Sequence, residues 1–182
     1  MTTAYADAVG DTLGRLFDVI DSDHDHRVEW ADYQRLVDRY LTGYALAPDS
    51  RKAVALRTAY RMAWTELLRH AGGPEPRLDR AEFIAALRTA VVDTSRFNLV
   101  EGLAHAVFDV LDADGGNTIG REEVIQLMDV LGVTTTDGLQ VFSAMDADGD
   151  GNVSRQEFIR SAREFFYRAD PRAPGGIIFG MV

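Results

Sequence analysis

The chain has 182 residues, a formal net charge of −10 and no cysteine. This acidity disfavours nucleic acid and anionic membranes as partners, because both bind basic protein faces, and the missing cysteines exclude disulfides, thiolate catalysis and Cys-ligated zinc. The N-terminal residues lack the pattern of a secretory signal and no apolar run is long enough to span a membrane, so the expected compartment is the cytoplasm. We also expect a monomer without nucleic-acid or membrane partners.

Apolar residues recur at spacings of three and four along almost the whole chain, which is the pattern of amphipathic helices. No alternating stretch is long enough to predict a substantial sheet. The sequence therefore predicts an all-α protein. We expect eight helices, at residues 6–20, 30–42, 49–70, 80–92, 97–111, 121–131, 135–145 and 155–167, followed by an irregular tail.

Short acidic or glycine-rich loops separate alternate helices, and this rhythm predicts four helix–loop–helix repeats. The repeats form an N-terminal pair at residues 1–92 and a C-terminal pair at residues 93–170, before an apolar tail at residues 171–182. Calcium takes about six to eight oxygen ligands, which a twelve-residue loop supplies from positions 1, 3, 5, 7, 9 and 12. Position 7 supplies its backbone carbonyl, and position 6 needs the sharp turn that glycine allows.

The first loop, DSDHDHRVEWAD, begins at Asp21 and departs from this pattern at two positions. His26 at position 6 must adopt a left-handed backbone without the freedom of glycine, and Asp32 at position 12 is one methylene shorter than glutamate. If this shorter arm gives one oxygen, calcium affinity falls or six-coordinate magnesium competes. A zinc site at His24 and His26 is less favoured, because no third histidine or cysteine lies nearby. The expected ligands of a divalent cation here are Asp21, Asp23, Asp25, the carbonyl of Arg27 and Asp32.

The second loop, AGGPEPRLDRAE, keeps Glu82 at position 12 but has alanine and glycine at positions 1 and 3. One carboxylate rarely holds a hard cation alone, so we expect no calcium there. Its expected role is structural. Leu78 would pair with Val28 of the first loop in a short β-bridge, as Ile119 would pair with Val153 in the other half.

The third loop, DADGGNTIGREE, keeps carboxylates at positions 1, 3 and 12. Gly116 at position 5 and Gly120 at position 9 offer no side-chain oxygen, so water would replace them, while Asn117 at position 6 suits a left-handed turn. We expect weaker binding than in the fourth loop. The expected ligands are Asp112, Asp114, Gly116 through water, the carbonyl of Thr118 and Glu123.

The fourth loop, DADGDGNVSRQE, meets every demand of a calcium loop. It has aspartates at positions 1, 3 and 5, Gly151 at position 6, apolar Val153 at position 8 and a glutamate at position 12, between two amphipathic helices. A solvated acidic turn without a cation is less favoured, because so many like charges repel one another. The expected ligands are Asp146, Asp148, Asp150, the carbonyl of Asn152 and Glu157.

These loops identify the chain as a member of the EF-hand superfamily, and it resembles the sarcoplasmic calcium-binding proteins and, among them, the bacterial calerythrin-like proteins. The resemblance rests on four hands that fill the chain, a degenerate second hand after the long helix from Ser50 to His70, and the terminal segment PGGIIFG. It implies two EF-hand pairs packed against each other as a compact globule. It also implies cytoplasmic calcium buffering or transport, with magnesium as a competitor.

The main alternative is a calcium sensor that exposes a hydrophobic groove to a target protein. The chain has few internal methionines, whereas calmodulin-type sensors use Met-rich surfaces, so the sequence favours the buffer. A ligand-carrying or enzymatic role like that of the calcium-triggered photoproteins is disfavoured, because histidines are few, the chain does not end in proline and no catalytic constellation stands out. We expect no enzyme.

The apolar tail has two interpretations. The residues Ile177, Ile178, Phe179 and Met181 either fold back into the cleft between the halves or reach out to a partner. Exposing such a cluster to water is costly. We therefore expect the tail to fill the cleft.

Overall fold

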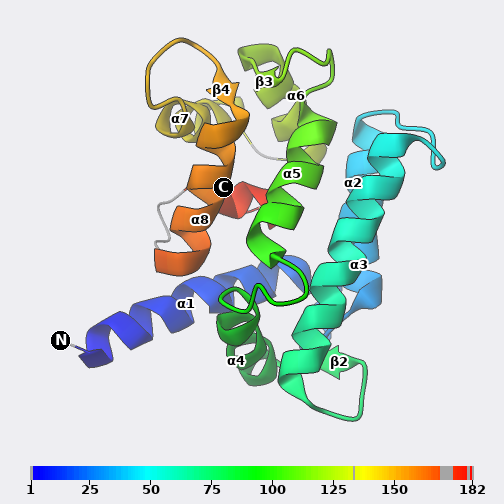
Figure 1. The fold of residues 1–182 in the computed structure, drawn as a ribbon, viewed down its shortest axis with the longest axis vertical. Coiled ribbons are helices and arrows are strands. Elements are labelled where there is room, and N and C mark those ends of the chain that lie inside the picture. Colours follow the sequence, from blue (N-terminus) through cyan, green and yellow to red (C-terminus); the bar gives the residue numbers. More distant parts are fainter. Residues whose placement is uncertain (1, 133, 169–173, 180, 182) are drawn as a thin grey trace.

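The computed structural model describes residues 2–132, 134–168, 174–179 and 181 (Figure 1). The described residues form eight α-helices, which confirms the all-α prediction. The helices are α1 (Thr2–Ile20), α2 (Trp30–Gly43), α3 (Arg51–Ala71), α4 (Arg80–Ala90), α5 (Leu99–Leu111), α6 (Arg121–Leu131), α7 (Thr135–Met145) and α8 (Arg155–Arg168). None of them is long and apolar enough to cross a membrane.

Helix boundaries follow local capping chemistry. The Ser50 hydroxyl accepts a hydrogen bond from the Ala53 N–H (3.3 Å) where α3 begins, and Asp79 and Glu82 form a reciprocal capping box at the start of α4. Gly72, with a left-handed φ of 66°, ends α3. These caps hold the degenerate second loop between its two helices without a metal ligand set.

Two short β-bridges join the loops in pairs. The strand β1 (Val28–Glu29) pairs antiparallel with β2 (Arg77–Leu78), and β3 (Thr118–Ile119) with β4 (Val153–Ser154). The register places Val28 opposite Leu78 and Ile119 opposite Val153, as predicted, and all four side chains are buried. The second loop therefore supports the first through backbone pairing.

The N-terminal and C-terminal hands share one hydrophobic core. In Figure 1, α3 lies along α5, and α2 packs against α6. A Cβ atom on Gly43, at the end of α2, would collide with Val130 of α6. The Lys52 ammonium of α3 also donates a hydrogen bond to the Asp112 carbonyl (2.6 Å), the first residue of the third loop. The two pairs form a compact globule because these contacts cross between them.

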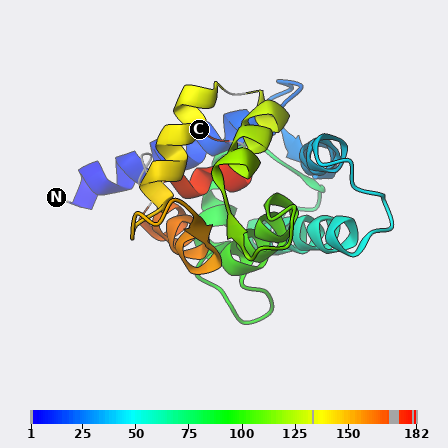
Figure 2. The same cartoon turned by 90° about the horizontal axis from the view of Figure 1, so that it is seen from above.

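The tail is more regular than predicted, because Pro174–Phe179 form a short 3-10 helix, η1. It lies near the centre of the molecule (Figure 2) and packs against α8, α1, α7 and α5. The Tyr40 hydroxyl of α2 donates to the Ile177 carbonyl (3.3 Å), and the Ile177 side chain is 3% exposed. This confirms for Ile177 that the tail fills the space between the halves, while the side chains of Ile178 and Phe179 lie outside the described part of the structure.

Candidate metal centres

The fourth loop, between α7 and α8, gathers three of its four acidic side chains around one point, and Asp150 is not in this group. Oxygen atoms of Asp146, Asp148 and Glu157 lie within 4.8 Å of one another. The Asp146 carboxylate also accepts the N–H groups of Gly149 (2.9 Å) and Gly151 (3.0 Å). The loop backbone is therefore wrapped around the carboxylate at position 1.

Glu157 bridges the two ends of the fourth loop. Its Oε1 accepts the Ala147 N–H (2.9 Å) and its Oε2 accepts the Ser154 N–H (2.8 Å), while Asp150 at position 5 accepts the Asn152 N–H (2.8 Å). Burial raises the pKa of Glu157, but the hydrogen bonds from Ser154 and Ala147 outweigh burial and lower it. The carboxylate is thus ionised at neutral pH, as a calcium ligand must be.

The third loop, between α5 and α6, repeats this arrangement. Asp112, Asp114 and Glu123 have oxygens within 4.8 Å of one another, and Glu123 accepts the N–H groups of Ala113 (2.7 Å) and Gly120 (2.8 Å). Asp112 Oδ1 is buried and has no hydrogen-bond partner among the described residues. A buried carboxylate oxygen without a partner is costly, so this donor set fits a hard cation such as calcium.

The remaining predicted positions lie beside the β-bridges. Arg27 stands directly before β1 and Asn152 directly before β4, while Thr118 begins β3. Gly116 at position 5 donates its N–H to Asp114 Oδ1 (2.7 Å). This glycine contributes backbone geometry to the third loop and no side-chain ligand, as expected.

Left-handed backbone recurs at the same places in the three acidic loops. Position 6 is left-handed at His26 (φ 65°), Asn117 (φ 60°) and Gly151 (φ 86°), as predicted. Position 4 is left-handed as well, which was not predicted from the sequence. This position is glycine in the third and fourth loops but His24 (φ 58°) in the first. The first loop therefore holds two histidines in a backbone conformation that favours glycine.

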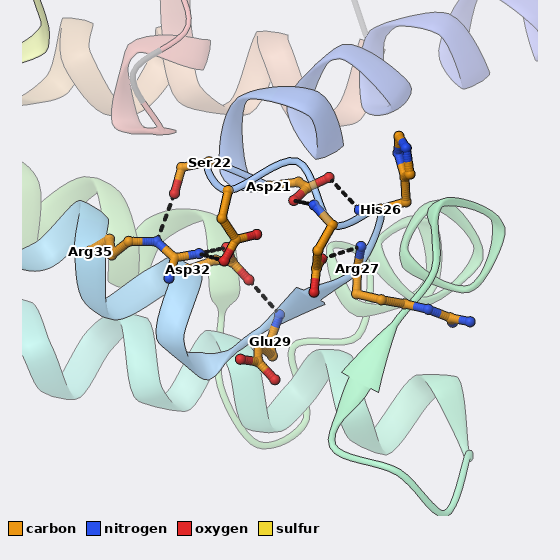
Figure 3. Close-up of polar contacts among 9 residues, drawn as sticks. Asp21, Ser22, His26, Arg27, Glu29, Asp32 and Arg35 are labelled. Atoms are coloured by element: carbon orange, nitrogen blue, oxygen red, sulfur yellow. Dashed lines mark hydrogen bonds and ion pairs between the residues drawn. The ribbon is translucent and has the colours of Figure 1, made fainter.

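The first loop, between α1 and α2, brings three of its four expected carboxylates together. Oxygens of Asp21, Asp23 and Asp25 lie within 4.8 Å of one another, and Asp21 accepts the N–H groups of Asp25 (3.1 Å) and His26 (3.0 Å). The His26 imidazole points away from Asp21 (Figure 3). The structure does not bring Asp32 into this group.

Asp32 is held by Arg35 instead. One Asp32 oxygen accepts the Glu29 N–H (2.8 Å) and the other accepts from Arg35, which also donates to the Ser22 hydroxyl (2.7 Å) and to Asp23 (2.8 Å) (Figure 3). Burial raises the pKa of Asp32, opposed by the Glu29 N–H and Arg35. Arg35 was not predicted from the sequence. The available signal was an arginine three residues after the last loop acid, on the same helical face.

The second loop has no comparable group of acids among the described residues. Glu82 accepts the Asp79 N–H (2.8 Å) in the α4 cap, and Glu75 accepts a hydrogen bond from Arg77 (2.6 Å). The side chain of Arg27 reaches from the first loop to Asp79 (3.7 Å). The acidic residues of the second loop therefore cap α4 and form ion pairs with arginines.

The family model of the EF-hand domain pair matches residues 101–163, which contain the third and fourth loops. A search of curated protein sequences gives no match.

Several solved structures share the fold over most of the chain. A calcium-binding protein of Streptomyces coelicolor is 24% identical with a TM-score of 0.71, over 87% of this chain and 97% of that one. The light-sensitive photoprotein berovin from the ctenophore Beroe abyssicola, in its Ca2+-loaded apoprotein state, is 27% identical with a TM-score of 0.70, over 85% of each chain. A sarcoplasmic calcium-binding protein from amphioxus is 16% identical with a TM-score of 0.65, over 97% and 98%.

The sequence match and the fold therefore agree. The matched pair carries two acidic loops with glutamate at position 12, and the likeness in fold to the amphioxus protein covers 97% of the chain. Residues 101–163 are an EF-hand domain pair with calcium-binding loops, and the chain has the fold of the sarcoplasmic calcium-binding proteins.

Proposed function

We propose that the protein is an intracellular calcium buffer or transporter, a monomer that holds one divalent cation in each of its first, third and fourth loops. The observation that carries the proposal is a repeated geometry: in the described part of the chain each of these loops has carboxylate oxygens within 4.8 Å of one another, and the second loop has no such group. The ligands would be Asp21, Asp23, Asp25, Arg27 and Asp32 in the first loop, Asp112, Asp114, Gly116, Thr118 and Glu123 in the third, and Asp146, Asp148, Asp150, Asn152 and Glu157 in the fourth.

Cation binding would also neutralise much of the acidity of the chain. Three divalent ions would change the formal net charge of −10 to about −4. Because the ions bind the folded protein, they would stabilise it by mass action. The metal-free form is therefore expected to be the less stable one.

The filled interior favours a buffer over a sensor or a ligand carrier. The apolar pocket of the C-terminal pair is lined by residues including Phe142 and Met145, and Ile177 of the tail closes it; the cavity that remains is about 20 Å³, roughly the space of one water. A small organic ligand occupies a site of about 300 Å³ or more. A sensor, in turn, would have to open this pocket to a target helix.

Regulation is the second candidate, and one comparison favours it. The structure of the Streptomyces coelicolor calcium-binding protein is described as the structural basis for prokaryotic calcium-mediated regulation by that protein. A sensor role for this chain would require η1 to leave the pocket when calcium binds.

Magnesium is expected to compete for these loops, most of all for the first. All three calcium-binding loops of berovin bind magnesium ions. In the first loop of this chain, Asp32 has a short side chain with one oxygen bonded to Arg35. A ligand side chain that offers one oxygen suits the six-coordinate shell of magnesium better than the larger shell of calcium.

A calorimetric calcium titration of metal-free protein in about 1 mM magnesium tests the proposal. We expect calcium to occupy three loops at saturation, displacing magnesium from the first loop last, and we expect a flat or falling signal from an apolar-surface dye, whereas a rising dye signal would favour the sensor. Glu157→Gln should remove one ion, because it takes away the bridging carboxylate of the fourth loop. Glu122→Gln, an exposed neighbour of Glu123, is the matched control and should keep all three. An unchanged stoichiometry in Glu157→Gln would contradict the assigned site.

A further inference from the structure

The twelfth residue closes the third and fourth loops but not the first. In the third and fourth loops one glutamate oxygen accepts the N–H of position 2 and the other accepts the N–H of position 9. In the first loop the shorter Asp32 accepts the N–H of position 9, from Glu29, and its other oxygen turns to Arg35. The end of the first loop is therefore held by the side chain of Arg35, which belongs to α2.

Arg35 spans the gap that the missing methylene leaves. Its Nε donates to the Ser22 hydroxyl at position 2 (2.7 Å), while one terminal nitrogen donates to Asp23 at position 3 (2.8 Å) and to Asp32 at position 12 (Figure 3). The planar guanidinium suits this task, because it offers several donors in fixed directions. It joins the beginning of the loop to its end, as the glutamate does in the other two loops.

The charges make this contact important for cation binding. The Asp32 side chain is 1% exposed, whereas that of Arg35 is 43% exposed. A buried carboxylate without a partner is strongly unfavourable, so Arg35 stabilises the metal-free loop. The same guanidinium carries the positive charge that a bound ion would otherwise supply to Asp23 and Asp32.

We propose that Arg35 is a built-in counter-ion of the first loop, which holds the loop closed without metal and must release Asp32 before a cation can use that carboxylate. The inference rests on the proposed cation site in this loop. Its consequence is a calcium affinity below that of the other two loops. The first loop then fills last, so the protein takes up calcium over a wider concentration range than three equal sites would allow.

The test compares Arg35→Met with Arg39→Met. Arg39 is exposed one turn further along α2 and bonds to none of the described loop carboxylates. Its substitution therefore removes one positive charge from α2 but no contact with Asp23 or Asp32. Occupancy of the first loop is followed by tryptophan fluorescence, because the two tryptophans, Trp30 and Trp64, both lie in the N-terminal pair and Trp30 is within the loop. Calorimetry counts the ions, and thermal melts report the stability of the metal-free protein.

We expect Arg35→Met to tighten calcium binding in the first loop about tenfold, since one charge-assisted contact no longer competes, and to lower the melting temperature of the metal-free protein. Arg39→Met should change neither quantity. Arg35→Lys should fall between the wild type and Arg35→Met, because an ammonium keeps the charge but cannot span three oxygens at once. A first-loop affinity that is unchanged or weaker in Arg35→Met would overturn the proposal and leave Arg35 a structural ion pair.

The outcomes separate this inference from the three-site function. If the wild type binds two ions and Arg35→Met binds three, the counter-ion proposal is supported and the three-site count is corrected. If neither protein has a third site, the counter-ion proposal is overturned while the third and fourth loops keep their roles.

Discussion

Residue by residue, the first loop differs from its counterparts in backbone strain as well as in ligands. His24 and His26 adopt φ values of 58° and 65°. A left-handed conformation costs a residue with a Cβ atom roughly 1–2 kcal/mol, whereas glycine is free of this cost. This strain lowers the stability of the metal-free loop.

Replacing His26 by glycine should therefore stabilise the protein slightly. The relief of strain exceeds the extra entropy that glycine gives the unfolded chain, about 0.4–1 kcal/mol, so we expect a net gain of about 0.5–1 kcal/mol. Thermal melts of the metal-free protein would detect a rise of about 1–4 °C. His26→Ala removes the imidazole but keeps the strain and should give no such gain. An equal gain in both variants would mean that the imidazole, and not the backbone, was the unfavourable feature.

At the scale of elements, the parts that could be predicted from sequence were those governed by short-range rules. The helices follow a local apolar period, and the loop positions follow a fixed count, so the pairing of Val28 with Leu78 and the left-handed turn at His26 were both foreseen. The contact of Arg35 with Asp32 was missed because it depends on how α2 leaves the loop. The 3-10 helix of the tail was missed because it forms against helices that are far away in sequence.

One ion-pair network joins α3 to the segment that follows α4. Arg69 donates to Glu66 (2.8 Å) and to Asp93 (2.5 Å), and His70 lies 3.2 Å from Asp93. The Arg69 guanidinium therefore forms ion pairs with both the Glu66 and the Asp93 carboxylates. This network fixes the end of the N-terminal pair where the chain crosses to the C-terminal pair.

Asp93→Asn should show how much this network contributes and at which pH. Hydrogen bonds from Ser95 and Arg69 hold the pKa of Asp93 well below its ordinary value of 3.8. Because the folded-state pKa is the lower one, ionised Asp93 stabilises the fold above pH 3.8, and this contribution is lost as the pH falls below that value. We expect Asp93→Asn to lower the melting temperature of metal-free protein at pH 7 and to have a smaller effect near about pH 3.

A matched exposed pair provides the control for this network. Asp18 pairs with Arg80, and both side chains are at least half exposed, so Asp18→Asn should change stability little at either pH. If Asp93→Asn behaves like Asp18→Asn at pH 7, the network does not contribute measurably to stability.

For the whole molecule, the decisive feature is that both halves and the tail share one interior. Lys52 links α3 to the third loop, and Tyr40 of α2 donates to the Ile177 carbonyl of η1. Gly175 lies so close to the Ser161 carbonyl of α8 that a Cβ atom would collide with it. Opening the C-terminal pocket would therefore disturb contacts with both pairs of hands, and this coupling favours a protein that stays closed when it binds calcium.

Ile177→Ala tests whether the tail keeps the pocket closed. Ile177 is 3% exposed and lines the pocket with Phe142 and Met145, so its truncation should lower the free energy of unfolding by about 2–4 kcal/mol through lost burial and a new cavity. It should also let an apolar dye bind the calcium-loaded protein, because the floor of the pocket becomes accessible. Val92→Ala removes apolar atoms from a side chain that is 67% exposed and should change both measurements little.

The calcium dependence of the dye signal decides what the tail does. If Ile177→Ala binds dye equally with and without calcium, the tail is a fixed part of the core and calcium does not move it, as a buffer requires. If wild-type protein gains dye on calcium binding and Ile177→Ala does not gain more, then calcium itself displaces η1. In that case the pocket is the binding site for a target protein, and the tail covers the pocket in the absence of calcium.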